Sequence, residues 1–347
     1  MRDLAAYSYA NARIRALLSY LISPPLLSRL LEAKDVYEVI EGLKGTDYKS
    51  IQEQFEQGRT DLSDIEKGFF IHDLGAYDKV YDSLSGKREK ELVFLFIQRY
   101  ELQELKAVLR IWNKKAPVDT RDYLVGRKIA FDIDFHKISA AQNIEELILL
   151  LDETPYKTPL LKAKDRFKRT GSVFYLETAL DIDYYRRLLA CVDTLSGGDR
   201  RIARKVLGIE IDIENINWLV RAKKYYSLAT GEILEMIIPG GGTISADTVR
   251  QLSGSEGLEG LLDNIAVGPY MKIKDFAAGN AALLENFLYE IMLREIRRLL
   301  AGFPFTIGTV LGYLILKNRE TRILTSLLYA KHYGLKKEEA LPLIGTS

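Results

Sequence analysis

The most informative segment of the sequence is Arg186-Arg187-Leu188-Leu189-Ala190-Cys191-Val192-Asp193-Thr194-Leu195-Ser196-Gly197, because both of its halves recur elsewhere in the chain. The second half is nearly repeated 111 residues earlier as Asp82-Ser83-Leu84-Ser85-Gly86. The first half is repeated 111 residues later as Arg297-Arg298-Leu299-Leu300-Ala301. Two different segments that recur at one offset indicate an internal duplication. Three such units account for nearly all of the 347 residues.

An apolar triplet with the spacing i, i+3, i+4 occurs four times at corresponding places. This spacing puts the three side chains on one face of a helix, where they can pack against neighbouring helices. The four copies are Ile14, Leu17 and Leu18; Leu105, Val108 and Leu109; Ile216, Leu219 and Val220; and Leu324, Leu327 and Leu328.

A second recurring block ends in a tyrosine. Residues Val36–Tyr48 align without gaps on Ile144–Tyr156 and on Leu258–Tyr270, and their apolar columns follow the spacing i, i+3, i+4, i+7. Each block therefore predicts an amphipathic helix, followed by turn-forming residues and the tyrosine. Ser23-Pro24-Pro25, before the first block, predicts a helix start with proline in the first turn.

These elements follow one another in three cycles, and a fourth copy of the apolar triplet closes the chain. We therefore expect an all-α protein of three pseudo-repeated helical domains with approximate threefold symmetry. The last helices would complete the first unit, so the expected domains are residues 1–85 with 305–347, residues 86–190, and residues 191–304.

Composition excludes several classes of protein. The formal net charge of +1 gives no broad basic field for nucleic acid. Cys191 is the only cysteine, so an internal disulfide is impossible and a reducing cytoplasmic setting is expected. Its apolar neighbours predict a buried, inert thiol. The chain opens Met1-Arg2-Asp3-Leu4, which does not resemble a signal peptide.

Leu299–Leu316 contains no charged residue and just meets the length of a transmembrane helix. Its glycines and Pro304 interrupt the stretch, and its repeat counterpart is more polar. We therefore interpret it as two buried helices joined at Phe303-Pro304, with a membrane span as the less favoured alternative.

No pattern for catalysis, cofactor binding or metal binding is found. The Pro239–Thr243 segment lacks the lysine of a phosphate-binding loop and predicts a plain loop. Neighbouring Asp132 and Asp134, like Asp181 and Asp183, are two residues apart and cannot bind one ion from one helix face, so helix starts and solvated faces explain them better. The histidines are scattered and are expected at the surface: His72, His136 and His332.

Several segments resemble the C subunit of archaeal and bacterial A/V-type rotary ATP synthases/ATPases, a family that also includes the d-type subunit of the vacuolar proton pump. The resemblance spans nearly the whole chain. The segments that carry it are Tyr7–Ala16, Leu26–Tyr48, Glu214–Ile216 with Arg221–Lys223, Ile237–Gly241, Phe303–Gly308 and Lys317–Glu320.

The resemblance implies an all-helical funnel between the membrane rotor ring of proteolipid subunits and the central shaft subunits D and F. It would turn with them and transmit torque, coupling ion transport to ATP synthesis or hydrolysis, as a peripheral protein at the cytoplasmic face of the membrane. It implies no active site and no cofactor.

Because family funnels are lined by polar and charged side chains, four arginines beside the apolar triplets are candidate contacts with partners: Arg13, Arg15, Arg110 and Arg221. Each could instead form a salt bridge with a neighbouring helix. Three other functions remain open: a generic helical-repeat scaffold for another partner, an all-α enzyme with an unrecognised site, and an integral membrane protein.

Overall fold

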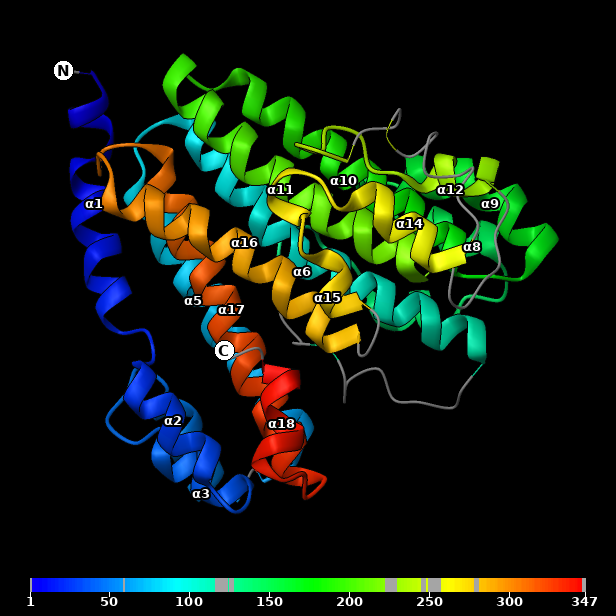
Figure 1. Cartoon of the computed structure of the whole chain (residues 1–347). Coiled ribbons are helices and arrows are strands. Elements are labelled where there is room, and N and C mark those ends of the chain that lie inside the picture. Colours follow the sequence, from blue (N-terminus) through cyan, green and yellow to red (C-terminus); the bar gives the residue numbers. More distant parts are fainter. Residues whose placement is uncertain are drawn as a thin grey trace.

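The computed structural model describes residues 2–58, 60–115, 124, 128–221, 230–244, 248, 257–277 and 281–344. Every regular element in these ranges is a helix, which confirms the all-α class. The chain begins with α1 (Arg2–Ser19), which runs along one flank of the molecule (Figure 1).

Three long helical hairpins form the body. They pair α5 (Leu62–Ser83) with α6 (Lys87–Lys114), α10 (Phe174–Thr194) with α11 (Gly197–Arg221), and α16 (Ala281–Ala301) with α17 (Ile307–His332). The duplicated segments at 82–86 and 193–197 are the turns of the first two hairpins, so the sequence repeat corresponds to a repeated helix pair.

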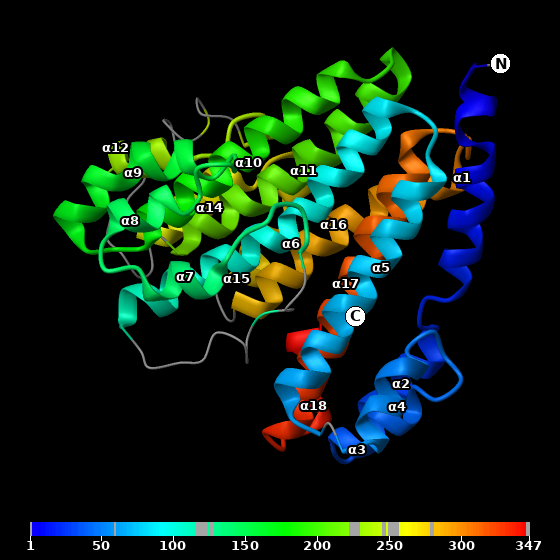
Figure 2. The same cartoon turned by 180° about the vertical axis from the view of Figure 1, so that it is seen from behind.

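The three hairpin turns lie near one another, at the end of the molecule where α1 begins (Figures 1 and 2). Asp199, at the start of α11, accepts hydrogen bonds from the Tyr7 hydroxyl at 2.8 Å and from the Ile307 backbone N–H at 2.9 Å. The Cys191 thiol points to the Arg88 carbonyl at the start of α6, with 3.9 Å between sulfur and oxygen. These contacts connect all three turns.

Shorter helices come before, between and after the hairpins along the chain, and the predicted amphipathic helices of the tyrosine blocks are among them. They are α2 (Pro24–Glu32), α3 (Val36–Gly42), α4 (Lys49–Glu56), α7 (Phe135–Ala140), α8 (Ile144–Leu149), α9 (Lys157–Thr170), α12 (Thr230–Met236), α14 (Gly257–Ile265), η3 (Gly268–Tyr270), α15 (Ile273–Ala277) and α18 (Lys337–Ile344).

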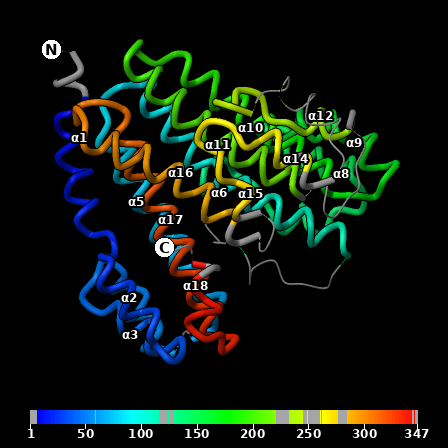
Figure 3. Tube along the Cα trace, in the orientation of Figure 1, coloured from blue at the N-terminus to red at the C-terminus, as the bar shows by residue number. Residues whose placement is uncertain are grey.

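Both ends of the chain contribute to one apolar core. This core contains buried residues of α2, α3 and α4 together with Leu324, Leu327 and Leu328 of α17 and Ala340 of α18. The Lys331 ammonium group donates a 2.7 Å hydrogen bond to the Leu31 carbonyl, which joins the same two regions. The blue segment with α2 and α3 lies near the red helix α18 accordingly (Figure 3).

Two further cores complete the interior. The largest includes buried residues of α1 and of all three hairpins. The third lies around the second half of α11, α14 and the first half of α16. Cys191 is 5 % exposed, which confirms the predicted burial, and this burial raises the pKa of its thiol to about 12.

Several local predictions are also confirmed. Ser23 caps α2, with Pro24 at its first position. Residues 299–316 form the end of α16 and the start of α17, joined through Phe303 and Pro304. In the described ranges, no helix has both the length and the apolar character needed to span a bilayer.

Candidate functional site

Three buried tyrosines, one from each tyrosine block, bind carboxylates on the long helices. The hydroxyl groups donate to Glu320 from Tyr48 at 2.6 Å, to Glu101 from Tyr156 at 3.0 Å, and to Asp212 from Tyr270 at 3.0 Å. All three tyrosines are at most 1 % exposed. The tyrosine–carboxylate pair is thus a repeated structural unit, and it fixes each block to a long helix.

All three carboxylates also accept backbone N–H groups, and Glu320 accepts that of Ile22. Glu101 accepts from Ala130 and Phe131, both at 2.8 Å. Asp212 accepts from Thr243 at 2.7 Å and from Ile244 at 2.8 Å. Burial raises the pKa of Glu101 and of Asp212, and these N–H donors partly oppose the rise.

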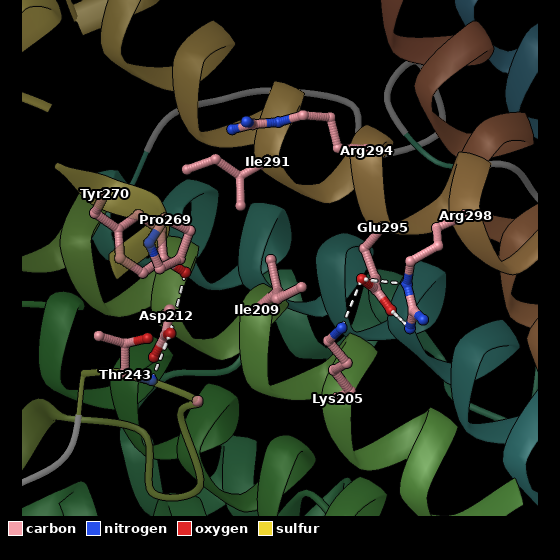
Figure 4. Close-up of a pocket in the computed structure, with 11 residues that line it drawn as sticks. Lys205, Ile209, Asp212, Thr243, Pro269, Tyr270, Ile291, Arg294, Glu295 and Arg298 are labelled. Carbon is pink, nitrogen blue, oxygen red and sulfur yellow. Dashed lines mark hydrogen bonds and ion pairs between the residues drawn. The ribbon is translucent and has the colours of Figure 1, made fainter. Parts of the chain in front are cut away.

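The third pair lies at the edge of a side cavity of about 480 Å³ between α11 and α16. Figure 4 shows Tyr270 and Thr243 pointing to Asp212 on one side of this cavity. On the other side, Glu295 accepts from Lys205 at 2.8 Å and from Arg298 at 2.5 Å. Asp212 and Glu295 thus both have partners in the structure. Their contacts connect α11 to α16, to the loop that contains Thr243, and to η3.

A larger cavity of about 580 Å³ lies between the three hairpins. All six long helices of the hairpins line it, and its surface combines aromatic rings with charged and polar side chains. Apart from Ile238, its lining residues fall within the segments 66–73, 99–110, 177–185, 213–218, 285–289 and 318–326, and only some residues of each segment face the cavity. None of these residues belongs to a hairpin turn, so the cavity lies in the half of the body away from the turns.

Ion pairs connect adjacent helices across this cavity. Lys106 binds Asp181 at 2.8 Å, and Arg110 binds Glu177 at 2.5 Å, which joins α6 to α10 in both cases. Arg322 of α17 binds Glu285 of α16 at 2.8 Å. A fourth cation, Arg99, pairs with Glu210 of α11. These pairs hold the walls of the cavity in place.

The ion pairs differ in depth. The Arg110 and Arg322 side chains are 56 % and 62 % exposed, whereas those of Lys106 and Asp181 are 10 % and 13 % exposed. Arg110 and Arg322 therefore mark the mouth, and Lys106 and Asp181 lie deeper. Burial raises the pKa of Asp181, and the nearby Lys106 ammonium group opposes this effect.

Asp73 of α5 is the most buried carboxylate of the cavity, with no exposed surface. Its Oδ2 atom accepts a hydrogen bond from the Tyr100 hydroxyl. Within the described residues, its Oδ1 atom makes no hydrogen bond of normal geometry, and neither does the Thr321 hydroxyl of α17. Burial raises the pKa of Asp73 to about 6, against the opposing effects of Tyr100 and of the nearby Lys317 and Thr321.

Of the four candidate arginines, Arg110 lines the central cavity. Arg13 and Arg15 are exposed on α1, and neither lines this cavity. Arg221 is the last residue of α11, and its side chain lies outside the described residues. Contact of these four arginines with a partner stays a prediction. The expected salt bridge to a neighbouring helix is present at Arg110.

Two interpretations from the sequence were wrong. Asp181 does not lie on a solvated face, because it is buried in an ion pair with Lys106. His72 is not at the surface: its side chain is 13 % exposed, its Nε2 atom lies 2.9 Å from the Asp47 carbonyl oxygen, and its ring packs on Tyr48. By contrast, Asp134 does cap a helix, accepting the Lys137 N–H at 3.0 Å.

The tyrosine–carboxylate pairs were missed, although the sequence contains a signal for them. Glu101, Asp212 and Glu320 each stand four residues before an apolar triplet, at its second, third and fourth copies. Asp73 has no such signal, because its surroundings come from α6 and α17, whose residues lie far from it in the sequence.

Comparison with known proteins gives matches over nearly the whole chain. The family model described as ATP synthase (C/AC39) subunit matches residues 10–341. The chain is 26 % identical to the C subunit of the A-type ATP synthase of Pyrococcus abyssi, over 98 % of this chain and 90 % of that protein. It is 24 % identical to the protein of the same name from Methanocaldococcus jannaschii, over 99 % of this chain and 87 % of that protein.

A third relative, the C subunit of the A-type ATP synthase of Thermococcus onnurineus, is 26 % identical over 98 % of this chain and 90 % of that protein. The family description and these names indicate a structural component of the synthase and not a catalytic one. With a match from residue 10 to residue 341, the chain belongs to the ATP synthase (C/AC39) subunit family.

Proposed function

We propose that this protein is the central-stalk adaptor of an A/V-type ATP synthase/ATPase. It joins the membrane rotor ring to the shaft subunits D and F and transmits torque between them, at the cytoplasmic face of the membrane. The observation that carries this proposal is the central cavity, which is lined by all six helices of the three hairpins and is rich in charged and polar side chains.

The position of the cavity indicates which end of the protein faces the shaft and which end faces the rotor ring. Its exposed ion pairs lie away from the hairpin turns, so the cavity opens toward the ends where the helices diverge. The end of the shaft enters there. The opposite end, where the three turns gather, faces the loops of the rotor ring. Polar contacts suit a partner that must be held in a fixed orientation.

Stiffness is the property that torque transmission requires, and buried contacts between distant segments supply it. The three tyrosine–carboxylate pairs fix the short helices to the long ones, and the ion pairs fix the long helices to one another. A body with these connections passes a twist applied in its cavity to its other end.

The threefold arrangement is part of the same proposal. We assign residues 1–85 with 305–347 to the first unit, residues 86–190 to the second and residues 191–304 to the third, arranged as a funnel around the cavity. The core shared by α2, α3, α17 and α18 supports the closure of the first unit by the end of the chain.

A larger side chain in the cavity tests whether the shaft docks there. Thr325 lines the cavity, and Thr325→Trp fills part of it without adding charge. Thr158→Trp is the matched control, because Thr158 is exposed on α9 and is not part of the lining. Titration calorimetry with the purified D–F pair should show strongly weakened binding for Thr325→Trp and unchanged binding for Thr158→Trp. Equal affinities for the two variants would contradict docking in this cavity.

A further inference from the structure

The charges that line the central cavity do not balance. Among the described residues, six carboxylates line it: Glu66, Asp73, Glu177, Asp181, Glu214 and Glu285. Four described cationic side chains line it: Arg99, Lys106, Arg110 and Arg322. This described part of the lining therefore has an excess of acidic groups, although the whole chain has a formal charge of +1.

All four cations are already engaged. Lys106, Arg110 and Arg322 each pair with a carboxylate of the lining, and Arg99 pairs with Glu210, which is outside the lining. None of the four is thus available to Asp73 or Glu214. Lys317, whose charge acts on Asp73, is bound to Glu320 at 3.0 Å and to the Tyr48 hydroxyl at 2.7 Å.

Asp73 is the carboxylate of the cavity that most needs a further hydrogen-bond donor. It is fully buried, and its Oδ1 atom has no hydrogen-bond partner of normal geometry among the described residues. A buried carboxylate oxygen without a donor is costly, and a native structure that keeps one needs a reason for it. The Thr321 hydroxyl, on the facing helix α17, lines the same cavity and lies close enough to Asp73 to lower its pKa, but it makes no hydrogen bond of normal geometry with any described residue.

Glu214 adds a second acidic group from a different hairpin. It lines the cavity from α11 and forms no ion pair with any described residue. Burial raises the pKa of Glu214, and the negative charge of Asp181 adds to the rise. A positive charge placed in the cavity would relieve both effects.

We propose that the deep part of the central cavity is a pocket for a cationic side chain, in which Asp73 receives an arginine or lysine from the end of the shaft and Glu214 adds negative charge to the same cavity. This rests on the proposed function, because it names the chemistry of the partner that enters the same cavity. The incoming N–H group donates to the free Oδ1 atom of Asp73, and its charge balances the acidic excess. The arginines at the mouth keep their present partners.

Neutral variants of the same size test the pocket. Asp73→Asn and Glu214→Gln remove a negative charge each while they retain the shape of the side chain. Asp132→Asn and Glu153→Gln are matched controls, because both residues are exposed outside the cavity. We expect about tenfold or greater weakening of D–F binding by Asp73→Asn and a smaller weakening by Glu214→Gln, since a buried charge loses its partner.

The salt dependence of Kd provides a second measurement. Binding by the unmodified protein should weaken as salt rises, and Asp73→Asn should reduce this slope. Circular dichroism checks that the variants remain helical; if Asp73→Asn does not fold, Glu214→Gln carries the same expectation from another helix.

The two proposals fail in different ways. If Thr325→Trp blocks binding while both neutral variants bind as tightly as the controls, the cation pocket is wrong and the docking stands. If Thr325→Trp also leaves binding unchanged, the cavity does not receive the shaft and both proposals fall.

Discussion

Tyr48 and Glu320 are separated by 272 positions in the chain, and the Tyr48 hydroxyl donates a 2.6 Å hydrogen bond to the Glu320 carboxylate. The Lys317 ammonium group completes the cluster, 2.7 Å from the hydroxyl oxygen and 3.0 Å from the carboxylate. All three side chains are buried. The cluster therefore connects the first tyrosine block to the last long helix.

Removal of the Tyr48 hydroxyl should destabilise the protein. We expect Tyr48→Phe to lower the free energy of unfolding by about 1–2 kcal/mol, because a buried carboxylate loses a donor. Tyr156→Phe and Tyr270→Phe should have effects of similar size, since their partners are equivalent. Tyr37→Phe is the control, because Tyr37 is 58 % exposed. Urea unfolding measures the four variants, and losses no larger than that of Tyr37→Phe would contradict a structural role for the pairs.

Removal of the last helix should loosen the beginning of the chain. Deletion of residues 333–347 takes away α18, whose Ala340 and Ile344 belong to the core shared with α2 and α3. We expect faster amide hydrogen exchange in residues 22–58 and unchanged exchange in α10, which lies outside this core. Mass spectrometry of the truncated protein measures both regions at once. Equal protection of residues 22–58 in the two proteins would show that the chain end does not complete the first unit.

The stability contribution of Asp73 should depend on pH. Its pKa is about 6 in the folded protein, above the ordinary value of 3.8, so the folded state binds the proton more tightly. Stability therefore falls as pH rises between these two values. We therefore compare the free energies of unfolding of Asp73→Asn and of the unmodified protein. The value for the variant minus that for the unmodified protein should be about 1–2 kcal/mol larger at pH 7.5 than at pH 5. Urea unfolding at both pH values tests this, and a difference that does not change with pH would contradict a raised pKa.

Gly241 should resist substitution. A Cβ atom at this position would lie 2.4 Å from Asp212 Oδ1 and 2.6 Å from the Ile244 carbonyl oxygen, so Gly241→Ala forces the loop away from Asp212. We expect a loss of about 2–3 kcal/mol in the free energy of unfolding. Gly198→Ala is the control, because a Cβ atom there meets no atom within 4 Å. The prediction fails if thermal unfolding shows the two variants to be equally stable.

Helical periodicity and the duplicated segments predicted much of the fold. Leu105 and Leu324 belong to apolar triplets that are buried as expected, and the repeated segments at 82–86 and 193–197 are hairpin turns. These features were predictable because each depends on residues close together in the sequence. The partner of Tyr48 was not, since a hydrogen bond over 272 positions leaves no local pattern.

The central cavity was less accessible to sequence reasoning. Arg110 was chosen for its place beside an apolar triplet, and it does line the cavity. The burial of Asp73 was not predicted, and Asp181 was explained by a helix start or a solvated face, because acidic residues on a helix usually face solvent. Their burial depends on packing between helices from different hairpins. The sequence shows how many charged residues the chain has, but only the three-dimensional structure shows which of them are buried.

A photo-crosslink in the assembled complex would show which chain occupies the central cavity. A benzoylphenylalanine at position 325, inside the cavity, would react with whichever chain enters it, and mass spectrometry would identify that chain. Crosslinking to one of the two shaft proteins, D or F, is the result we predict. Crosslinks to other chains only, or none in an intact and active complex, would contradict the proposal that this protein receives the shaft in its central cavity.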